Sequence, residues 1–465
     1  AVLGAGEPHA RHITGPLQIR QYLPARRGTV AQESPVIVVA ARAVVGGMQP
    51  RIRLVQPRQP ERIGQAFRQR GHRDPFPRRV RPATRRRPQP NHRSQHPPNL
   101  LHFHLATAYY AQLQLINEPF FAPTTIHPDA GMIISRTPYR VSFFGGGTDY
   151  PAWYRRHGGA VLSAAIARYC YLTCRWLPPF FEHKSRIVYS IIEDVQRIED
   201  IRHPAVRECL RELGIRDGIE IHHDGDLPKM TGLGTSSSFT VGLLHALHAL
   251  RGECRSKMQL AEEAIHIERE RCGDRVGSQD QVAAAFGGLN CIRFAPDDTI
   301  VVQPVSLAAD RLAEFQDSLL LFFTGFSRIA SDIVAEQLQN IPRKEAELTE
   351  MARMVEEGRG ILTAGRDLAD FGRLLHESWR IKRSLSTRVS TPEIDAMYET
   401  ARRAGALGGK LTGAGGGGFL LLYVERDRQA AVRQALARLL HVPFDLDHTG
   451  SQIIFSNPVP LESTP

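Results

Sequence analysis

The sequence has few cysteines, and they do not form the pattern of a disulfide framework or a zinc site. Six cysteines occur in 465 residues, with no C-x-x-C pair and no histidine and cysteine spacing typical of zinc. Long apolar runs are also missing, since none approaches the roughly 20 residues that a membrane span needs. The first residues lack the charged and then apolar pattern of a secretory signal. We therefore expect a soluble, cytoplasmic protein with no membrane partner and with buried free thiols.

Lysine is absent from the first 131 residues, and this absence divides the chain into two parts. Residues 1–131 hold 19 Arg, 17 of the 31 prolines and only 6 Asp and Glu, with little hydrophobic periodicity. The remaining residues hold 40 Lys and Arg against 42 Asp and Glu, so the formal net charge of +11 comes from the first part alone. We predict a disordered Arg/Pro-rich extension over 1–131.

The extension has two interpretations. As a basic arm it would bind nucleic acid, but its Arg-rich part has few aromatic residues to stack on bases, and arginine without lysine is unusual for such an arm. We favour the interpretation that it is upstream DNA read through as protein, because a clear strand pattern starts only at Met132 and the printed chain does not begin with Met. Nucleic acid is therefore not an expected partner, and the fold prediction excludes the extension.

From Met132 onward, strand-like and helix-like patterns alternate, which is typical of a mixed α/β protein. Strands are predicted at 133–144, 187–191, 218–222, 289–294, 318–323 and 419–424. Helices are predicted at 239–250, 258–271, 331–369, 371–385 and 392–404. The strand at 318–323 indicates a second unit, so we place one domain over 132–305 and another over 306–465. The chain is long enough for two cores.

A glycine-rich segment, PKMTGLGTSS at 228–237, precedes a helix predicted to begin near Ser237. Gly232 and Gly234 allow backbone torsions and close approaches that a Cβ would block. The helix N-terminus carries about half a positive charge, and turn N–H groups bind phosphate oxygens, so the segment predicts an anion site. It is not the G-x-x-x-x-G-K-[ST] phosphate loop. A glycine turn capped by serine would also explain a bare G-x-G.

Three motifs together resemble those of the GHMP kinases, the superfamily of galactokinase, homoserine kinase, mevalonate kinase and phosphomevalonate kinase. The segment at 228–237 is similar to the superfamily's P-x-x-x-G-L-G-[ST]-S-[SA] phosphate loop, RVSFFGGGTDY at 140–150 to its first motif, and KLTGAGGGGF at 410–419 to its third. The resemblance covers 132–465. It implies an α/β (α+β) fold with an N-terminal ATP-binding domain like ribosomal protein S5 and a ferredoxin-like C-terminal domain, and phosphoryl transfer from ATP to an alcohol.

The resemblance also implies residue roles. GSQDQVAAAFGG at 277–288 is similar to the segment with the catalytic aspartate, which assigns Asp280 as the group that accepts or polarises the hydroxyl proton. Arg140 would support that carboxylate and offset charge on the γ-phosphate. Nucleotide binding is assigned to Pro228, Lys229, Gly232, Leu233, Gly234, Thr235, Ser236 and Ser237. Substrate binding is assigned to Gly146, Gly147, Thr148, Asp149, Gly415 and Gly416. The structural alternatives are a helix-capping Asp280 and a surface ion pair for Arg140 and Asp149.

For Mg²⁺, which prefers oxygen ligands, the resemblance assigns the hydroxyl of Ser236. Its acidic partner is Glu268 or Glu270, which lie twelve and ten positions before Asp280, and we favour Glu268. The alternative for both glutamates is a solvated helix face.

Other residues have weaker signals. His245 and His248 have the i, i+3 spacing of a metal pair, but helix packing or solvent explains them better. Arg328, between a predicted strand and a predicted helix, is a hypothetical contact for an anionic substrate group.

The form of the first motif bears on the acceptor. GGG at 145–147 stands where galactokinase has Gly-Glu-His, so two polar sugar contacts are missing and plain galactose is not expected. The chain resembles most the D-glycero-α-D-manno-heptose 7-phosphate kinase branch, with fucokinases close by. We predict an ATP- and Mg²⁺-dependent sugar or sugar-phosphate kinase; a fucokinase- or galactokinase-like 1-kinase is the alternative. A non-catalytic sugar and ATP sensor and a nucleic-acid binder are hypotheses from other classes, and a homo-oligomer is compatible with the sequence.

Overall fold

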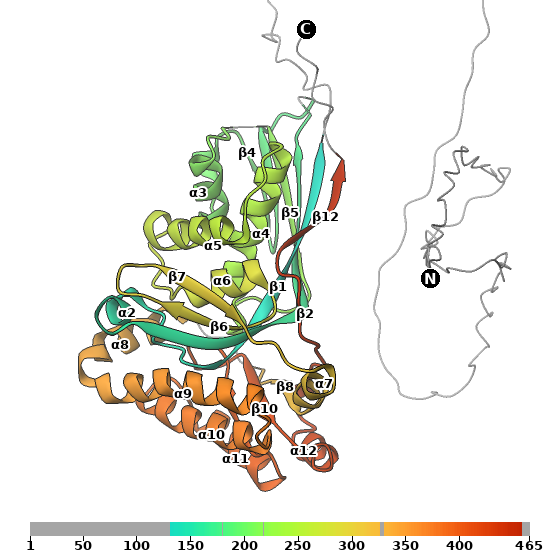
Figure 1. Cartoon of the computed structure of the whole chain (residues 1–465). Coiled ribbons are helices and arrows are strands. Elements are labelled where there is room, and N and C mark those ends of the chain that lie inside the picture. Colours follow the sequence, from blue (N-terminus) through green and yellow to red (C-terminus); the bar gives the residue numbers. More distant parts are fainter. Residues whose placement is uncertain (1–130, 179, 217, 326–329, 458–465) are drawn as a thin grey trace, which may run out of the picture. The chain divides into compact units, whose positions relative to one another are not determined.

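The computed structural model describes residues 131–178, 180–216, 218–325 and 330–457 (Figure 1). The predicted extension over 1–131 lies outside these residues, apart from Gly131, and so does Arg328. The described chain has two β-sheets with helices packed on both, as the alternating sequence pattern predicts.

The larger sheet has eight strands and contains the first of the three motifs. Six strands follow the order β12-β1-β2-β5-β3-β4, and β2 also pairs with β6, which pairs with β7. Neighbouring strands are antiparallel, except that β3 and β5 are parallel. The strands are β1 (Met132–Phe144), β2 (Gly159–Trp176), β3 (Ser185–Val188), β4 (Ile192–Val195), β5 (Ile219–Gly225), β6 (Leu289–Phe294), β7 (Ile300–Pro304) and β12 (Gln452–Asn457).

The last described strand, β12, lies beside the first. Its register pairs Asn457 with Met132, and an isolated bridge joins Leu446 to Ile166 on β2. The second domain predicted over 306–465 therefore does not keep all of its residues on the second sheet. The predicted boundary between residues 305 and 306 itself stays a prediction.

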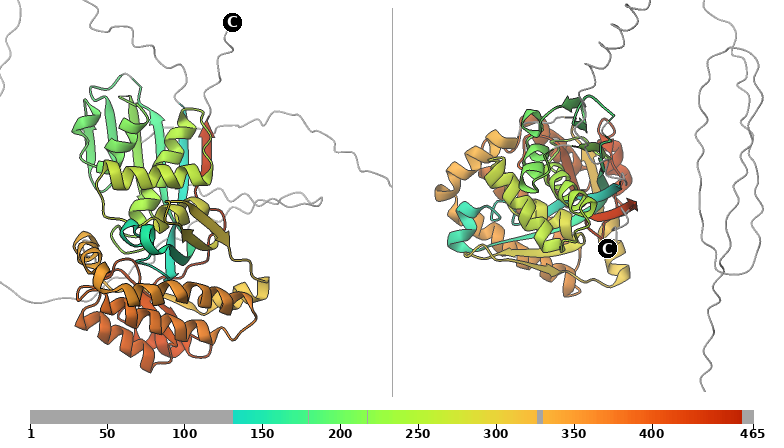
Figure 2. Two further views of the ribbon diagram at one scale, coloured as in Figure 1. Left: turned by 60° about the vertical axis from the view of Figure 1, so that its left-hand side comes forward. Right: turned by 90° about the horizontal axis from the view of Figure 1, so that it is seen from above.

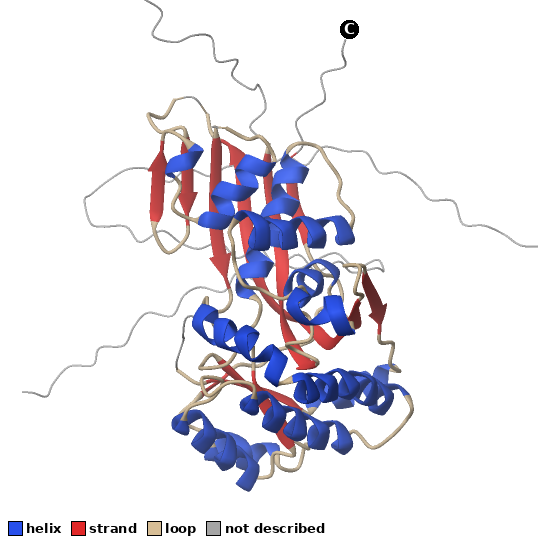
Figure 3. Ribbon diagram, turned by 90° about the vertical axis from the view of Figure 1, so that its left-hand side faces the viewer, coloured by secondary structure: helices blue, strands red, loops and turns tan. Residues whose placement is uncertain are grey.

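A group of helices packs on the larger sheet (Figure 3). Among them, α4 is in direct contact with β1 and β2. Most of the α4 side chains are buried, because α3, α5 and α6 cover the sides of α4 that the sheet leaves open. The predicted helix at 258–271 becomes α5 followed by one π-helical turn, η2. The bounds are α2 (Pro151–His157), α3 (Pro204–Glu212), α4 (Thr235–Leu250), α5 (Lys257–His266), η2 (Ile267–Arg271) and α6 (Gln279–Phe286), with a 3-10 turn, η1 (Ile198–Asp200).

The smaller sheet is antiparallel, in the order β11-β8-β10-β9, and helices pack beside it (Figure 2). Its strands are β8 (Leu319–Phe323), β9 (Gly408–Leu411), β10 (Phe419–Tyr423) and β11 (Leu440–His441). The helices of this half are α7 (Ala309–Asp317), α8 (Ala330–Asn340), α9 (Glu345–Thr363), α10 (Ala369–Ser384), α11 (Pro392–Arg403) and α12 (Gln429–Ala435). The helix predicted at 331–369 is interrupted by a 3-10 turn, η3 (Ile341–Arg343), because Pro342 lacks an N–H and restricts the residue before it.

The helices that the structure describes include none with both the length and the apolar content of a membrane span.

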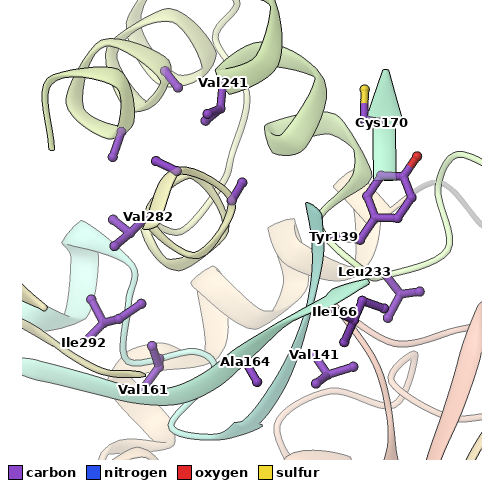
Figure 4. Close-up of a cluster of buried hydrophobic side chains, with 14 of the residues drawn as sticks. Tyr139, Val141, Val161, Ala164, Ile166, Cys170, Leu233, Val241, Val282 and Ile292 are labelled. Atoms are coloured by element: carbon purple, nitrogen blue, oxygen red, sulfur yellow. The ribbon is translucent and has the colours of Figure 1, made fainter. Parts of the chain in front are cut away.

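A buried cluster of phenylalanines connects the helices of the smaller sheet to the larger sheet. The ring of Phe143 on β1 lies 5.6 Å from that of Phe315 on α7 and 5.4 Å from that of Phe371 on α10, measured between centroids. These rings belong to one core that continues between β1, β2, α4 and α6 (Figure 4). Close packing of this core fixes the relative positions of the elements that carry the three motifs.

Candidate active site

The glycine-rich segment at 228–237 connects β5 to α4 and contains a left-handed residue at the helix cap. Gly234 is the N-cap of α4, with φ 73° and ψ 26°, a conformation that glycine adopts at little cost. The helix begins at Thr235, slightly earlier than predicted. Its first hydrogen bond runs from the Ser238 N–H to the Gly234 carbonyl, so the N–H groups of the residues between them lack helical partners. Together with the helix dipole, these groups can bind an anion.

Arg140 on β1 and Asp280 on α6 form a two-pronged ion pair beside this segment. Arg140 Nε lies 2.7 Å from Asp280 Oδ1, and Nη2 lies 2.8 Å from Oδ2. The third donor, Nη1, reaches the Gly232 carbonyl at 2.8 Å. The Arg140 side chain is 4% exposed and that of Asp280 is 26% exposed, so the carboxylate keeps one open side. The fork of hydrogen bonds fixes both the place and the orientation of the carboxylate.

The ion pair lies against the glycine-rich segment. A Cβ placed on Gly234 would lie 3.4 Å from Asp280 Oδ2 and 3.2 Å from Arg140 Cγ. The N-cap of α6 is Ser278 rather than Asp280, so the alternative of a helix-capping Asp280 is wrong. The burial of Arg140 likewise excludes a surface ion pair. The structure therefore brings together the helix N-terminus and the carboxylate that the sequence separates.

Asp149 belongs to the same cluster, at the turn between β1 and α2. Its Oδ1 accepts the Gly147 N–H at 2.9 Å, and its Oδ2 accepts a hydrogen bond from Gln279 Nε2 at 3.1 Å. Burial raises the pKa of Asp149; the Gly147 hydrogen bond opposes this shift, and the charge of Asp280 adds to it. A Cβ on Gly277 would lie 1.9 Å from Asp149 Oδ2, so only glycine fits there. Sequence reasoning missed Gly277, although it opens the segment that carries Asp280.

The neighbouring Thr148 holds the turn in shape. Its Oγ1 lies 2.8 Å from the carbonyl oxygens of both Gly145 and Ala160 and accepts the Ala160 N–H at 3.1 Å. The side chain is fully buried, so its hydroxyl is turned toward the chain and not toward a substrate, contrary to its predicted role. Gly146 and Gly147 are partly exposed, and substrate contact by their backbones stays a prediction.

The carboxylate of Glu268 lies in the interior beside the first turn of α4. The residue is 1% exposed, and its Oε2 accepts hydrogen bonds from Ser237 Oγ at 2.9 Å and Gln281 Nε2 at 2.6 Å. Its Oε1 is also buried, and the Thr240 side chain adds a hydrogen bond to the carboxylate. Burial raises the pKa of Glu268 to about 7, against the effect of its hydrogen bonds.

The predicted metal pair of Ser236 and Glu268 is not formed as expected. Ser236 is exposed, and its neighbour Ser237 is the residue that contacts Glu268. Successive side chains on a helix point about 100° apart. Motif spacing alone did not predict which of the two serines faces Glu268. Glu270 is exposed whereas Glu268 is buried. The two glutamates that the sequence offered as candidate metal ligands therefore differ in burial. Among the described residues, no group of three or more His, Cys, Asp and Glu side chains is arranged to hold a metal ion.

The glycine-rich segment at 412–418, between β9 and β10, lies directly against the glycine-rich segment at 228–237. A Cβ on Gly413 would lie 2.4 Å from the Gly232 Cα, and one on Gly418 would lie 2.2 Å from the Thr231 carbonyl oxygen. Both distances are too short for any side chain. The glycines of the two segments are therefore required by a contact between their backbones.

Other residues of the predicted binding set have contacts within the chain. The Gly416 N–H donates to the Val389 carbonyl at 2.9 Å, and a Cβ on Gly415 would lie 2.5 Å from that oxygen. Lys229 Nζ lies 3.5 Å from Ser190 Oγ. Ligand contacts of Gly415, Gly416 and Lys229 stay predictions.

The two histidines on α4 have partners within the protein. The His248 ring lies 2.9 Å from the Glu253 carboxylate and 2.6 Å from that of Glu263. His245 Nδ1 lies 2.9 Å from Ser451 Oγ. Helix packing explains both residues, as the sequence analysis favoured.

Two buried lysines near the ion pair were missed by sequence reasoning. Lys382 on α10 donates from Nζ to the carbonyls of Leu411, at 3.3 Å, and Gly413. Lys410 Nζ donates to the Phe143 carbonyl at 2.9 Å. Burial lowers the pKa of both, that of Lys382 to about 7. Lys410 opens the third motif and could have been noticed there, whereas Lys382 stands in the basic run WRIKR, which is typical of an exposed helix face.

A cavity of about 510 Å³ lies beside α2 and the turn η3. Its lining includes Arg155, Arg156, His157, Leu338, Ile341 and Glu345. A narrow recess shares Leu338 and Ile341 with it and reaches Gly147 and Tyr150. A cavity with basic side chains therefore adjoins the turn that carries Asp149.

Phosphoryl transfer to a hydroxyl requires a cradle for phosphate oxygens, a group that takes the hydroxyl proton and positive charge near the transferred group. The helix N-terminus at Gly234, the Asp280 carboxylate and the Arg140 guanidinium can meet these requirements at one place. Fold and site together define a small-molecule kinase.

Comparison with known families agrees with this class. The family model described as "GHMP kinases N terminal domain" matches residues 200–288, and the one described as "GHMP kinases C terminal" matches residues 359–442. The two models describe the two halves of one superfamily, the GHMP kinases, and they match this chain in the same order. The chain is an ATP-dependent phosphotransferase that acts on an alcohol. The family and the two-domain fold class that the motifs predicted are confirmed.

Several individual relatives are sugar kinases. The chain is 28% identical over 318 residues to D-glycero-alpha-D-manno-heptose 7-phosphate kinase of Campylobacter jejuni, covering 66% of this chain and 93% of the relative. It is also 28% identical over 352 residues to the bifunctional fucokinase/GDP-fucose pyrophosphorylase of Arabidopsis thaliana, covering 69% of this chain and 33% of that protein. The crystal structure of a D-glycero-D-manno-heptose 1-phosphate kinase from Bacteroides thetaiotaomicron is similar in fold, with a TM-score of 0.58 and 24% identity, covering 70% of this chain and 99% of that one.

Proposed function

We propose that the chain transfers the γ-phosphoryl group of ATP to the anomeric hydroxyl of D-glycero-α-D-manno-heptose 7-phosphate and releases ADP and the 1,7-bisphosphate. The observation that carries the proposal is the contact of the glycine-rich segment at 228–237 with the Arg140–Asp280 pair. A terminal phosphate at the N-terminus of α4 would lie next to a hydroxyl bound at Asp280. Such a position brings donor and acceptor into reacting distance.

In the proposed reaction, Asp280 accepts the proton of the sugar hydroxyl as its oxygen attacks the γ-phosphorus, and the bond to the ADP oxygen breaks. Arg140 holds the carboxylate through two hydrogen bonds and contributes positive charge near the transferred group. The free N–H groups at the start of α4 bind phosphate oxygens. The partly exposed Gly146 and Gly147 are the proposed sugar contacts. Asp149 is 2% exposed, and the proposed part of its carboxylate is to hold their turn through the Gly147 N–H.

The cavity beside α2 supports an acceptor that carries its own phosphate. Arg155, Arg156 and His157 line it, and it adjoins the recess at Gly147. Arg155 pairs with Asp298 at 2.9 Å, whereas Arg156 has no ion-pair partner among the described residues. Guanidinium groups bind phosphate through paired hydrogen bonds, so Arg156 is the proposed contact for the 7-phosphate.

An ADP-release assay tests the acceptor. We expect kcat/KM for heptose 7-phosphate to exceed that for the unphosphorylated heptose, fucose, galactose and mannose by about tenfold or more, because the unphosphorylated sugars leave Arg156 unpaired. Arg156→Ala should raise KM for heptose 7-phosphate and leave the rate with unphosphorylated heptose unchanged. Equal kcat/KM values with and without the 7-phosphate would contradict the phosphorylated acceptor.

Higher activity with fucose or galactose would favour the second candidate, a sugar 1-kinase like the fucokinase relative. Nucleotide binding without turnover would favour the sensor hypothesis.

We also propose that Glu268 supplies an oxygen ligand to Mg²⁺ together with a hydroxyl of the first turn of α4, from Ser236 as predicted or from Ser237. The buried Glu268 carboxylate lies 2.9 Å from the Ser237 hydroxyl, and carboxylate and hydroxyl oxygens suit Mg²⁺. Bound there with ATP, the metal would neutralise phosphate charge.

Glu268→Gln is expected to stabilise the metal-free protein at pH 8. The folded-state pKa of Glu268, about 7, lies above its ordinary value of 4.5, so the ionised carboxylate destabilises the fold above pH 7, and this effect disappears as the pH falls below 4.5. The difference corresponds to about 3 kcal/mol at pH 8. Thermal melts in EDTA should therefore show a higher Tm for the variant at pH 8 and a smaller difference at pH 5.

The same variant should need about tenfold more Mg²⁺ for half-maximal rate, because a metal ligand is lost. Glu270→Gln is the matched control, since Glu270 is exposed two residues further along η2 and should change neither Tm nor the Mg²⁺ requirement. An unchanged Mg²⁺ requirement in Glu268→Gln would remove Glu268 from the metal site.

A further inference from the structure

Lys382 is a buried lysine without a carboxylate partner. It is 6% exposed, and its Nζ donates to two backbone carbonyls, those of Leu411 and Gly413. Among the described residues no ion pair includes it. Burial of an unpaired cation opposes folding, so a buried lysine without a counter-ion needs a functional explanation.

The charges around Lys382 do not balance. Arg140 on β1, Lys410 on β9, Asp149 in the turn after β1 and Asp280 on α6 act on this cluster. With all groups ionised, three cations face two carboxylates, and Asp280 is already paired with Arg140 through two hydrogen bonds. Ionising both lysines would therefore leave an excess of positive charge in the cluster, which an anion would offset.

One of the two carbonyls that bind Lys382 belongs to a residue packed on the glycine-rich segment at 228–237. Lys382 holds the carbonyl of Gly413, the residue whose backbone packs on Gly232. The Gly232 carbonyl in turn accepts a hydrogen bond from Arg140 at 2.8 Å. The ammonium is thus joined by successive contacts to the place where the phosphates are proposed to bind.

The protonation of Lys382 responds to these charges. Burial, and then repulsion by Arg140, lowers its pKa to about 7, while Asp149 and Asp280 act in the opposite direction. Lys410 next to it has its pKa lowered by burial and by Lys382. At pH 8 Lys382 is therefore largely neutral in the free protein, and a nearby anion would favour the ammonium form.

We infer that Lys382 is a positioning residue that compensates charge in the phosphoryl-transfer site: its amine takes up a proton from solvent when the triphosphate binds, and the resulting ammonium offsets the negative charge of the γ-phosphate. The inference rests on the proposed function, and it names a linkage between nucleotide binding and protonation. The proton returns to solvent once the γ-phosphoryl group has left the site with the product, so the remaining ADP complex does not hold it.

Calorimetric titration at pH 8 in two buffers of different ionisation enthalpy measures this proton. The ligands are Mg²⁺ with ADP and Mg²⁺ with the β,γ-imido analogue of ATP, bound to the full-length protein. We expect the analogue to take up more protons than ADP does, with a difference approaching about one proton. Lys382→Met should lose that difference, and its kcat should fall about tenfold or more.

Lys257→Met is the matched control. Lys257 at the start of α5 also donates to two backbone carbonyls, those of Phe286 and Thr449, both at 2.8 Å, but in an exposed setting. Its loss should leave the proton difference and kcat unchanged. Lys382→Arg tests the charge without relying on the methionine variant, because a permanently charged guanidinium should retain part of the activity and show no proton uptake.

Equal proton uptake with ADP and with the analogue in the parent protein would overturn the inference. So would an unchanged proton difference in either Lys382 variant. If nucleotide binds and ADP is released but Lys382 takes up no proton, only this inference fails. If neither nucleotide binds, the proposed kinase site itself fails.

Discussion

Asp280→Asn is expected to lower kcat by about 10²- to 10⁴-fold while nucleotide still binds. The amide has nearly the shape of the carboxylate but cannot accept the proton of the attacking hydroxyl, and proton transfer by a positioned group accounts for a factor of this size. Nucleotide binding should persist because the N–H groups at the start of α4 belong to the backbone and not to Asp280. Steady-state ADP release, together with nucleotide binding measured directly, separates the two effects.

A second aspartate provides a matched control for this variant. Asp370 is the second residue of α10, as Asp280 is of α6, and it also pairs with an arginine, Arg373, at 2.6 Å. Its side chain is 35% exposed and lies in a surface ion pair. Asp370→Asn should therefore leave kcat within about twofold of the parent, since exposed ion pairs contribute little. If Asp280→Asn also stayed within that range, Asp280 would not be the proton acceptor.

Much of the fold was predictable from local patterns. The strands at 132–144 and 289–294 and the helices after the glycine-rich segment are marked by apolar runs of the right length, and the structure has them there. β12 was not predicted, because its six residues are largely exposed at the sheet edge and have no apolar alternation. Its place beside β1 is decided by long-range strand pairing, which local periodicity does not record.

The candidate site was likewise predictable only in part from the sequence. Motif resemblance located Arg140 and Asp280, and the structure brings their side chains together. It did not separate Ser236 from Ser237, because that difference is one step of helical rotation set by the exact start of α4. Lys382 was hidden because its burial results from packing between α10 and a segment that follows much later in the sequence. Charge in a basic run normally indicates solvent exposure.

Gly413→Ala is expected to lower kcat/KM for ATP by about 10²-fold. The added Cβ would lie 2.4 Å from the Gly232 Cα, whereas non-bonded carbons need about 3.5 Å or more, so one of the two glycine-rich segments must move by about 1 Å. Because the obstacle is backbone, no side-chain rotation relieves it. Movement of Gly232 also shifts the carbonyl that Arg140 holds, and a displacement of this size is enough to disturb the positions of donor and acceptor.

Backbone strain must be separated from this steric effect, and Gly365 makes the separation possible. Gly413 and Gly365 have nearly the same left-handed torsion, φ +65° and +68°, but a Cβ on Gly365 meets no atom within 4 Å. Alanine at either position costs about 1 kcal/mol in conformational strain, so both variants should melt slightly earlier than the parent. Only Gly413→Ala should lose ATP-dependent turnover. If Gly365→Ala lost as much activity, or if Gly413→Ala kept full kcat/KM, the contact between the two glycine-rich segments would have no part in forming the nucleotide site.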